Sequence, residues 1–575
     1  MTTSLVGTEI VLGIDIGTVN TRALLFDVVE GQYCFIAAGD APTTAEAPYH
    51  DPGEGMVRAV RVLQEVTGRD LLEPQGRLII PAKSDATGID RLVITYSAGE
   101  PVRMVVAGLL ADVSLDSARR LAASTYGSVV ESIGLNDRRR PEAQLDAILK
   151  AGPELVVFAG GTEGGASRSL GRLVDLLTLL CRVLPQDKRP EIVYAGNQNL
   201  AARIKEILEK WSSVRTAPNV RPSFDLEDLG PAELAISQAI SRIRQRQFPG
   251  MASISAFASA PPLPTAHAFG RVIRYLSKVY DPAKGVLGVD LGASSTVIAA
   301  GTAGKLNLSV SQYGMGRGAL RTLEASGLQD IIRWLPLHIP DDVVRDYLWQ
   351  KSLFPGLVPA TQDALAIEQA LARQALRLAM IQSQERYPDY SQLFGFILAC
   401  GAAISQAASP VQSLLMLLDG IQPVGISTLA LDQNGLTPSL GAISEFSPLL
   451  PVQVLESGAF LRLGTVIAPL SSARYGTPIL DCRVEYDNGG ETRLEVRKGS
   501  LVALPLQQGQ VAHLRLKALH GTLIDPRTRK STLGYKIIGG ACGAVIDGRG
   551  RPIELPPDAS RRRDQLKKWA MALGG

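Results

Sequence analysis

Two short segments of the chain carry the same order of residue types, and those types suit phosphate binding. The first, at residues 15–21, reads Asp-Ile-Gly-Thr-Val-Asn-Thr, and the second, at residues 290–296, reads Asp-Leu-Gly-Ala-Ser-Ser-Thr. In both, an apolar stretch ends at Asp-x-Gly and a second apolar stretch begins at the last threonine. A single Asp-x-Gly turn is common in ordinary hairpins. Two copies in matching contexts predict a duplicated unit, with phosphate-binding hairpins at 10–27 and 285–303.

The residues of these hairpins could bind a nucleotide together with magnesium. Gly17 and Gly292 allow a tight turn in which backbone N–H groups approach an anion. Asp15 and Asp290, at the strand ends, are candidates to hold Mg²⁺ through its waters, because hard cations prefer oxygen ligands. Both are also candidate catalytic groups. Residues that can offer donors to phosphate oxygens follow each glycine, and the predicted set is Thr18, Asn20, Thr21, Ala293 through its backbone, Ser294, Ser295 and Thr296.

Small residues after residue 399 form a third candidate element. The apolar stretch at 394–399 predicts a strand, and Cys400-Gly401-Ala402-Ala403 predicts a turn toward the next helix. Small side chains at such a turn would let an adenine or ribose lie against the backbone at Gly401 and Ala402. The alternative is that these residues simply allow close packing of a strand against a helix.

Two glycine-rich loops offer further candidates. The loop at 160–165 follows a predicted strand and precedes a predicted helix, so it could cradle an anion at the helix N-terminus. Glu163 within it is a candidate catalytic residue that could orient a water or a metal, and the alternative is a turn that contacts a neighbouring domain. The loop lacks the lysine of a P-loop. At 313–318, the glycines either place Arg317 near a phosphate or simply join a strand to a helix.

These candidate residues require a multi-domain α/β protein to position them. Apolar, β-branched stretches separated by turn residues at 10–42 recur at 285–311. From about residue 76, strands alternate with helices, which predicts an inserted domain with a parallel sheet, to which the strand at 91–97 is assigned. The predicted organisation is a first lobe at 8–75, the inserted α/β domain at 76–215, a helical connection and linker at 216–284, a second lobe at 285–446, a β-rich domain at 447–558 and a basic helical tail at 559–575.

The composition argues against several classes of protein. Apolar residues make up 46% and charged residues 20% of the chain, as in an ordinary globular protein. A net charge of +3 without long basic runs argues against nucleic acid as a partner. Five scattered cysteines outside any CxxC pair indicate neither a disulfide framework nor a zinc site, and they fit a cytoplasmic location. The first residues lack the pattern of a secretory signal. The uncharged stretch at 390–418 contains too many polar residues for a transmembrane segment.

The order and spacing of sequence blocks over residues 8–446 resemble those of a known family. The arrangement is similar to the superfamily of actin, the heat-shock chaperones and the sugar kinases, and within it to the MutL-type proteins associated with adenosylcobalamin-dependent glutamate mutase. The matching blocks are VLGIDIGTVNTRALLFD (11–27), ELVVFAGGTEGGASR (154–168), EIVYAGNQNLAARI (191–204), GVDLGASSTVIAAG (288–301), FILACGAAIS (396–405) and LALDQNGLTPSLGAIS (429–444). Ala293 and Cys400 stand where the family usually has glycine.

The resemblance implies an actin-like fold with duplicated ribonuclease-H-like lobes, and ATP and Mg as cofactors. It also implies an ATP-dependent chaperone or reactivating factor for a partner enzyme of the adenosylcobalamin mutase type. Two other functions stay open: a cytoskeletal or scaffold actin-like protein of the cell-division or pilus-assembly type, and a small-molecule kinase, for which no carboxylate base is apparent. The sequence does not decide whether ATP is hydrolysed slowly or only bound. The partner, the oligomeric state and the role of the β-rich domain also stay undecided.

Overall fold

The computed structural model describes residues 9–165, 167–388, 393–528 and 530–574. Most of the residues on which the absence of a secretory signal was predicted, and parts of the stretches at 154–168 and 390–418, lie outside these ranges. The chain divides into two compact units. Unit 1 comprises Met1–Phe269, Leu308–Val310 and Pro438–Pro451, and unit 2 comprises Gly270–Asn307, Ser311–Thr437 and Val452–Gly575. Three of the divisions fall within helices, namely α8 (Thr265–Val279), α15 (Leu436–Ile443) and α16 (Leu449–Glu456).

The first sheet of unit 1 carries the first predicted hairpin. Its spatial order is β3-β2-β1-β4-β10, with β1 to β3 antiparallel and β4 parallel to β1. Helix α1 packs on it because Met56, Val60 and Leu63 belong to the same apolar core as the strands. Asp51 begins the helix by accepting from Gly53 N at 2.9 Å. The bounds are β1 (Val11–Ile16), β2 (Asn20–Val29), β3 (Gln32–Pro42), α1 (Pro52–Thr67), β4 (Arg91–Tyr96) and β10 (Leu263–Pro264).

The strand at 91–97, assigned to the inserted domain from the sequence, lies in this first sheet instead. β4 pairs with β1 in parallel register, which places Thr95 opposite Asp15. The assignment was wrong because an apolar strand buried on both faces looks the same in either sheet. Its neighbour is decided by packing against side chains far away in the sequence.

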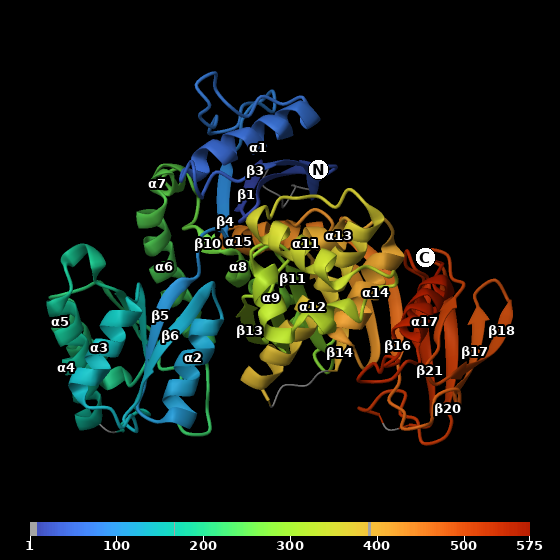
Figure 1. Cartoon of the computed structure of the whole chain (residues 1–575). Helices are drawn as coiled ribbons and strands as arrows, with labels where there is room; N and C mark the ends of the chain where they lie inside the picture. The colour runs from blue at the N-terminus through green and yellow to red at the C-terminus, as the bar shows by residue number, and fades with distance from the viewer. Residues whose placement is uncertain (1–8, 166, 389–392, 529, 575) are drawn as a thin grey trace. The chain divides into compact units, whose positions relative to one another are not determined.

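The parallel α/β domain of unit 1 has helices on both faces of its sheet (Figure 1). The strands take the order β6-β5-β7-β8-β9, and all run parallel. Side chains of β5 alternate: Met104 and Val106 join the core of α2 and α6, whereas Val105 and Ala107 join that of α3, α4 and α5. The bounds are β5 (Val102–Ala107), η1 (Ala111–Leu115), α2 (Asp116–Ala123), β6 (Gly127–Ile133), α3 (Pro141–Ala151), β7 (Leu155–Phe158), α4 (Ser167–Val183), η2 (Gln186–Lys188), β8 (Glu191–Tyr194), α5 (Gln198–Leu208), β9 (Val214–Thr216), α6 (Gly230–Gln247) and α7 (Pro249–Ser255).

The second large sheet repeats the strand order of the first. Its order β13-β12-β11-β14-β15 corresponds to β3-β2-β1-β4-β10, with β11 and β12 antiparallel and β14 parallel to β11. This duplication confirms the predicted actin-like α/β fold. The bounds are β11 (Gly285–Leu291), β12 (Thr296–Thr302), β13 (Lys305–Ser311), α9 (Gly318–Ser326), α10 (Leu328–Ile332), α11 (Asp341–Leu353), α12 (Gln362–Arg386), β14 (Phe394–Cys400), α13 (Ala402–Ser405), α14 (Pro410–Ile421) and β15 (Gly425–Leu431).

The strands of the predicted β-rich region are divided between two sheets. β16, β22 and β19 extend the second large sheet to eight strands, whereas β18, β17, β20 and β21 form an antiparallel sheet of their own. The bounds are β16 (Leu461–Ala468), β17 (Pro478–Tyr486), β18 (Glu491–Arg497), β19 (Leu501–Leu504), β20 (Val511–Ala518), β21 (Thr532–Ile538), β22 (Ala544–Asp547) and the tail helix α17 (Ala559–Ala572). Within the described ranges, no helix combines the length and apolar character that crossing a membrane requires.

A buried ion network connects the C-terminal elements to helices α12 and α14. Asp419 of α14 is 2% exposed and accepts from Arg373 Nε at 2.7 Å and from Arg549 Nη1 at 2.6 Å. Arg549 and Arg551 also donate to Asp547, at 2.8 and 2.9 Å. Burial alone would raise the pKa of Asp547, but the two guanidinium groups outweigh it and hold this pKa well below its usual range. Asp547 is therefore ionised, and both buried carboxylates are paired with guanidinium groups.

The network also fixes the tail helix. The Arg549 guanidinium lies 4.8 Å from the centroid of the Trp569 ring, and Trp569 Nε1 donates to the Gly499 carbonyl at 3.0 Å. Leu566 and Trp569 are both buried in the core of unit 2. The apolar side of the tail is therefore used inside the protein.

Replacing Asp419 by alanine should leave two buried guanidinium groups without their shared partner. We expect D419A to lower the free energy of unfolding by about 3–5 kcal/mol, because an unpaired buried charge is strongly destabilising. Urea denaturation followed by tryptophan fluorescence measures this change. The control is R321A, which removes an exposed pair with Glu324 at 3.3 Å and should change the same free energy by less than about 1 kcal/mol. Equal effects of the two substitutions would contradict the network.

Candidate functional site

The two predicted hairpins have the same turn geometry. Gly17 N donates to the Asn20 carbonyl at 2.9 Å, and Gly292 N donates to the Ser295 carbonyl at 2.9 Å. A Cβ atom on Gly17 would lie 2.7 Å from the Asn20 carbonyl oxygen, so this turn excludes a larger residue. The last strand pairs also correspond, with Ile16 opposite Thr21 in the first hairpin and Leu291 opposite Thr296 in the second. The first hairpin belongs to unit 1 and the second to unit 2.

The threonines that end the two turns face the protein interior. Thr21 and Thr296 are both fully buried. The Thr21 hydroxyl lies 3.4 Å from that of Thr43, and the Thr296 hydroxyl donates to the Tyr313 carbonyl at 2.8 Å. These hydroxyls therefore hold each hairpin to the segment that follows its third strand. Of the other predicted phosphate ligands, Asn20 is exposed and Thr18, Ala293, Ser294 and Ser295 are half-buried.

Asp15 is held by two hydroxyl donors that sequence reasoning did not identify. Thr95 Oγ1 of β4 and Thr265 Oγ1 of α8 donate to the same carboxylate oxygen, Oδ1, at 2.6 and 2.8 Å. In the described part of the chain, no group donates to Oδ2, so this oxygen is available to a metal-bound water. A threonine in an apolar strand gives no signal of such a role before the pairing of β4 with β1 is known.

Asp290 has a different neighbour at the corresponding position. The parallel pairing of β11 with β14 places Cys400 opposite Asp290, as Thr95 lies opposite Asp15. The two aspartates therefore occupy equivalent places in the fold. Both are half-buried.

The small-residue turn after β14 lies directly against the second hairpin. Gly401 has φ 105°, and a Cβ atom there would lie 2.2 Å from the Leu291 carbonyl oxygen. Helix α13 begins at the next residue, Ala402. The structure thus brings the predicted adenosine turn beside Gly292 and its neighbours.

The glycine-rich segment at 313–318 supports the same hairpin. Backbone N–H groups of Gly316 and Gly318 donate to the Ala293 carbonyl at 2.7 and 3.1 Å, and that of Met315 donates to Gly292 at 3.0 Å. A Cβ atom on Gly314 would lie 2.8 Å from the Gly292 carbonyl oxygen. These glycines therefore do more than join β13 to α9, because their small size allows the segment to contact the turn.

Glu163 lies in the loop that follows β7. This strand belongs to the parallel sheet, whereas Asp15 is in β1 of the first sheet. Its carboxylate accepts from Gln198 N at 3.2 Å and from Asn219 Nδ2 at 2.7 Å. Gln198 begins helix α5, where a negative charge is favourable. These bonds link the loops after β7, β8 and β9. Over the described residues, no cluster of three or more His, Cys, Asp or Glu side chains offers a metal site.

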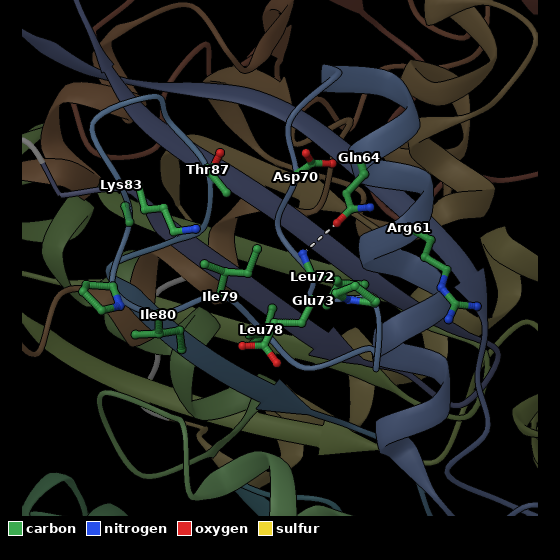
Figure 2. A pocket seen from close by; sticks show the side chains of 13 residues that line it. Arg61, Gln64, Asp70, Leu72, Glu73, Leu78, Ile79, Ile80, Lys83 and Thr87 are labelled. Carbon is green, nitrogen blue, oxygen red and sulfur yellow. Dashed lines mark hydrogen bonds between the residues drawn. The ribbon is translucent and has the colours of Figure 1, made fainter.

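A separate cavity of about 1050 Å³ lies in unit 1 beside α1, and none of the predicted site residues lines it (Figure 2). Leu78, Ile79 and Ile80 contribute apolar surface, and the side chains of Arg61 and Lys83 lie on opposite sides of the view. Gln64 Oε1 holds the cavity loop in place by accepting from Leu71 N and Leu72 N at 2.8 and 2.7 Å. The sequence did not predict this cavity because its walls come from two separate elements, helix α1 and the loop at residues 70–87.

The comparisons with known proteins give a family and a set of distant structures. A family model described as MutL protein matches residues 11–458. No match to a curated protein was found. Similar solved structures include a diol dehydratase-reactivating factor in nucleotide-free form, with 11% identity, TM-score 0.30, and coverage of 78% of this chain and 100% of that chain. A glycerol dehydratase reactivase has 11% identity, TM-score 0.29, and coverage of 76% and 99%. The xylulose kinase from Bifidobacterium adolescentis has 12% identity, TM-score 0.29, and coverage of 78% and 93%.

Substituting Gly401 tests the close contact between the small-residue turn and the second hairpin. G401A would combine left-handed strain, which costs about 1–2 kcal/mol, with a clash against the Leu291 carbonyl. The matched control is G458A, where φ is 82° and nothing lies within 4 Å of the added Cβ. We expect G401A to lower the thermal unfolding midpoint clearly more than G458A. Equal shifts would show that the turn does not approach the hairpin this closely.

Proposed function

The chain belongs to the MutL family, and from this membership and the duplicated hairpins we propose that it is an actin-like ATP-binding protein that assists a partner enzyme. Its role would be that of a nucleotide-driven chaperone or reactivating factor. The single observation that carries the proposal is the repeated turn at Gly17 and Gly292, each closed by the same backbone hydrogen bond at 2.9 Å. Each turn stands at the same place in the same strand order.

Each hairpin offers the chemistry that a phosphate and its magnesium ion require. Backbone N–H groups following Gly17 and Gly292 would contact phosphate oxygens, with Thr18, Asn20, Ser294 and Ser295 adding side-chain donors. The free Oδ2 of Asp15 would accept from a magnesium-bound water, and Asp290 would do the same from its equivalent position. The backbone around Gly401 and Ala402 would face the adenosine. Bound Mg-ATP supplies the interaction energy that can favour one conformation over another.

Under the same proposal, the partner enzyme binds to the parts of the chain that lie outside the two repeated sheets. A ligand changes a conformational equilibrium only through its differential affinity for the two states. The parallel domain and the C-terminal sheet are large additions that carry no recognisable catalytic set in the described residues, so we assign partner contact to them. By family membership, the partner would be an adenosylcobalamin-dependent mutase.

The apolar side of the tail helix α17, through which a scaffold protein could attach to another surface, is buried. Attachment through the tail would need an apolar helix face, but Leu566 and Trp569 of α17 are buried. Met571 is the large apolar side chain of that helix that is exposed. The chaperone role is therefore preferred over the scaffold role.

Calorimetric titration with Mg-ATP tests the nucleotide site. We expect the purified chain to bind one nucleotide, and D15A and D290A each to weaken binding by about tenfold or more, because a charged ligand to the magnesium shell is lost. The control is D85A. Asp85 lies in an exposed loop, and its carboxylate accepts a hydrogen bond from the nearby Thr87 N. Absence of binding by the unmodified chain would reject the proposal.

An activity assay tests the chaperone role separately. An adenosylcobalamin-dependent mutase that carries a damaged cofactor should recover activity when this chain, Mg-ATP and fresh adenosylcobalamin are added together. We expect D290A to abolish the recovery while leaving the fold intact by circular dichroism. Equal recovery with and without ATP would contradict nucleotide-driven action, even if the chain binds ATP.

A further inference from the structure

Helix α11 of unit 2 exposes large apolar side chains at its C-terminal end (Figure 1). On its buried side, Val344 and Leu348 join the core of unit 2. Trp349 and Leu353, which are one helical turn apart, are nevertheless 52% and 69% exposed. Phe354, the residue that follows the helix, is 66% exposed. The end of α11 is therefore apolar on its solvent side as well as on its core side.

The exposed apolar residues continue in the loop after the helix. Leu357 and Val358 are also exposed, and Leu357 N donates to the Phe354 carbonyl at 2.9 Å, so a turn follows α11 directly. Half of the ten residues at 349–358 are thus large, apolar and exposed. Single exposed apolar side chains are ordinary, whereas a cluster marks an interaction surface. We call Trp349, Leu353, Phe354, Leu357 and Val358 the apolar patch.

Buried polar contacts hold the backbone of this patch in place. Lys351 lies on the buried side of α11, where it donates to the Leu357 carbonyl and pairs with Glu368 of α12 at 2.6 Å. The Tyr347 hydroxyl donates to the same carboxylate at 2.8 Å. The loop is therefore tied both to the helix that precedes it and to α12. A surface that is already ordered loses less conformational entropy when a partner binds.

The same loop contacts the segment that supports the second hairpin. A Cβ atom on Gly316 would lie 2.6 Å from Pro355 Cβ and 3.2 Å from Ala293 Cβ. Gly316 N donates to the Ala293 carbonyl at 2.7 Å. Pro355, within the patch loop, is therefore separated from the predicted phosphate turn by a single glycine. A partner bound to the patch would lie beside a segment that contacts this turn.

The exposed charges of α11 favour a basic partner. Its exposed charged residues are three aspartates and one arginine, namely Asp341, Asp342, Asp346 and Arg345. Asp342 and Asp346 share one side of the helix with Trp349 and Leu353, because the four positions follow the spacing i, i+4, i+7 and i+11. Among the described residues, neither of these two carboxylates forms a hydrogen bond or ion pair. They would attract lysine or arginine, and they would be repelled by an anionic membrane surface.

We propose that the apolar patch, together with Asp342 and Asp346, is the docking site for an amphipathic, basic helix of a partner protein. The partner helix would pack its apolar side against Trp349 and Leu353 and bring lysine or arginine side chains to the two aspartates. This inference rests on the proposed function and deepens it, since it adds a surface to those assigned to the partner above. Its test requires no nucleotide, so its failure can be told apart from failure of ATP binding.

The test uses the full chain and two fluorescent, end-blocked helical peptides that contain no tryptophan. Both carry the same leucine side, and the polar positions are lysine in one and glutamate in the other. Fluorescence anisotropy measures their affinities. We expect the lysine peptide to bind about tenfold or more tightly than the glutamate peptide, and W349S/L353S to weaken the lysine peptide by a similar factor.

The matched control is L179S/V183S on α4. These two residues are likewise one helical turn apart, and they are 45% and 54% exposed. This variant should bind the lysine peptide as the unmodified chain does, because it removes the same kind of exposed apolar pair elsewhere.

Tryptophan fluorescence locates the binding. Trp349 is exposed, whereas Trp334 and Trp569 are buried and Trp211 is half-buried. Bound peptide should therefore shift the emission to shorter wavelength by covering Trp349. The variant W349F should still bind the lysine peptide but lose this shift.

Neutralising the aspartates provides a second, independent arm. D342N/D346N should reduce the preference for the lysine peptide over the glutamate peptide, because the attraction to lysine and the repulsion of glutamate are both lost. The proposal is overturned if the lysine peptide does not bind, if the two peptides bind the unmodified chain equally, if binding leaves the tryptophan emission unchanged, or if both double serine variants weaken it equally. It is also overturned if the patch is covered in a dimer of this chain, as sedimentation velocity would show, or if phosphatidylserine vesicles cause the emission shift and the peptide does not.

Discussion

The constraint on which the rest of this structure depends is the close approach of backbones around two tight turns. At Gly17 and Gly292 a single N–H to carbonyl bond closes the hairpin, and a side chain in the first of these turns would strike the backbone. Other backbones then come equally close, most clearly at Gly314 and Gly401 beside the second turn. Glycine is therefore required in these segments because a Cβ atom would clash with backbone atoms of neighbouring segments, and not only because glycine allows unusual dihedral angles.

Around these turns the two lobes use different side chains for equivalent positions. In the first, Thr95 and Thr265 donate to Asp15 and so orient its carboxylate. In the second, Cys400 lies opposite Asp290. The two sheets thus share their strand order, while the residue opposite the aspartate differs. This pattern is expected when hairpin geometry is fixed by backbone bonds and the surrounding side chains are free to specialise.

The C-terminal additions are attached by buried charges as well as by apolar packing. Asp419 and Asp547 share the guanidinium group of Arg549, and Trp569 covers that group. Because each buried charge has its partner, the network avoids the cost of an isolated ion. The resulting attachment gives the eight-stranded sheet a firm C-terminal extension.

The sequence by itself determined the two hairpins, the α/β class and the family, because these follow from contacts between residues a few positions apart and from blocks of fixed spacing. The turn at Gly17 bonds to Asn20 and that at Gly292 bonds to Ser295, so each turn forms within its own seven residues, and the occurrence of two such copies made the prediction specific. Only the tertiary structure decided the neighbours of each strand. It placed β4 beside β1, β16 beside β15, and Thr265 on Asp15, because those pairings depend on packing between distant segments that no local pattern encodes.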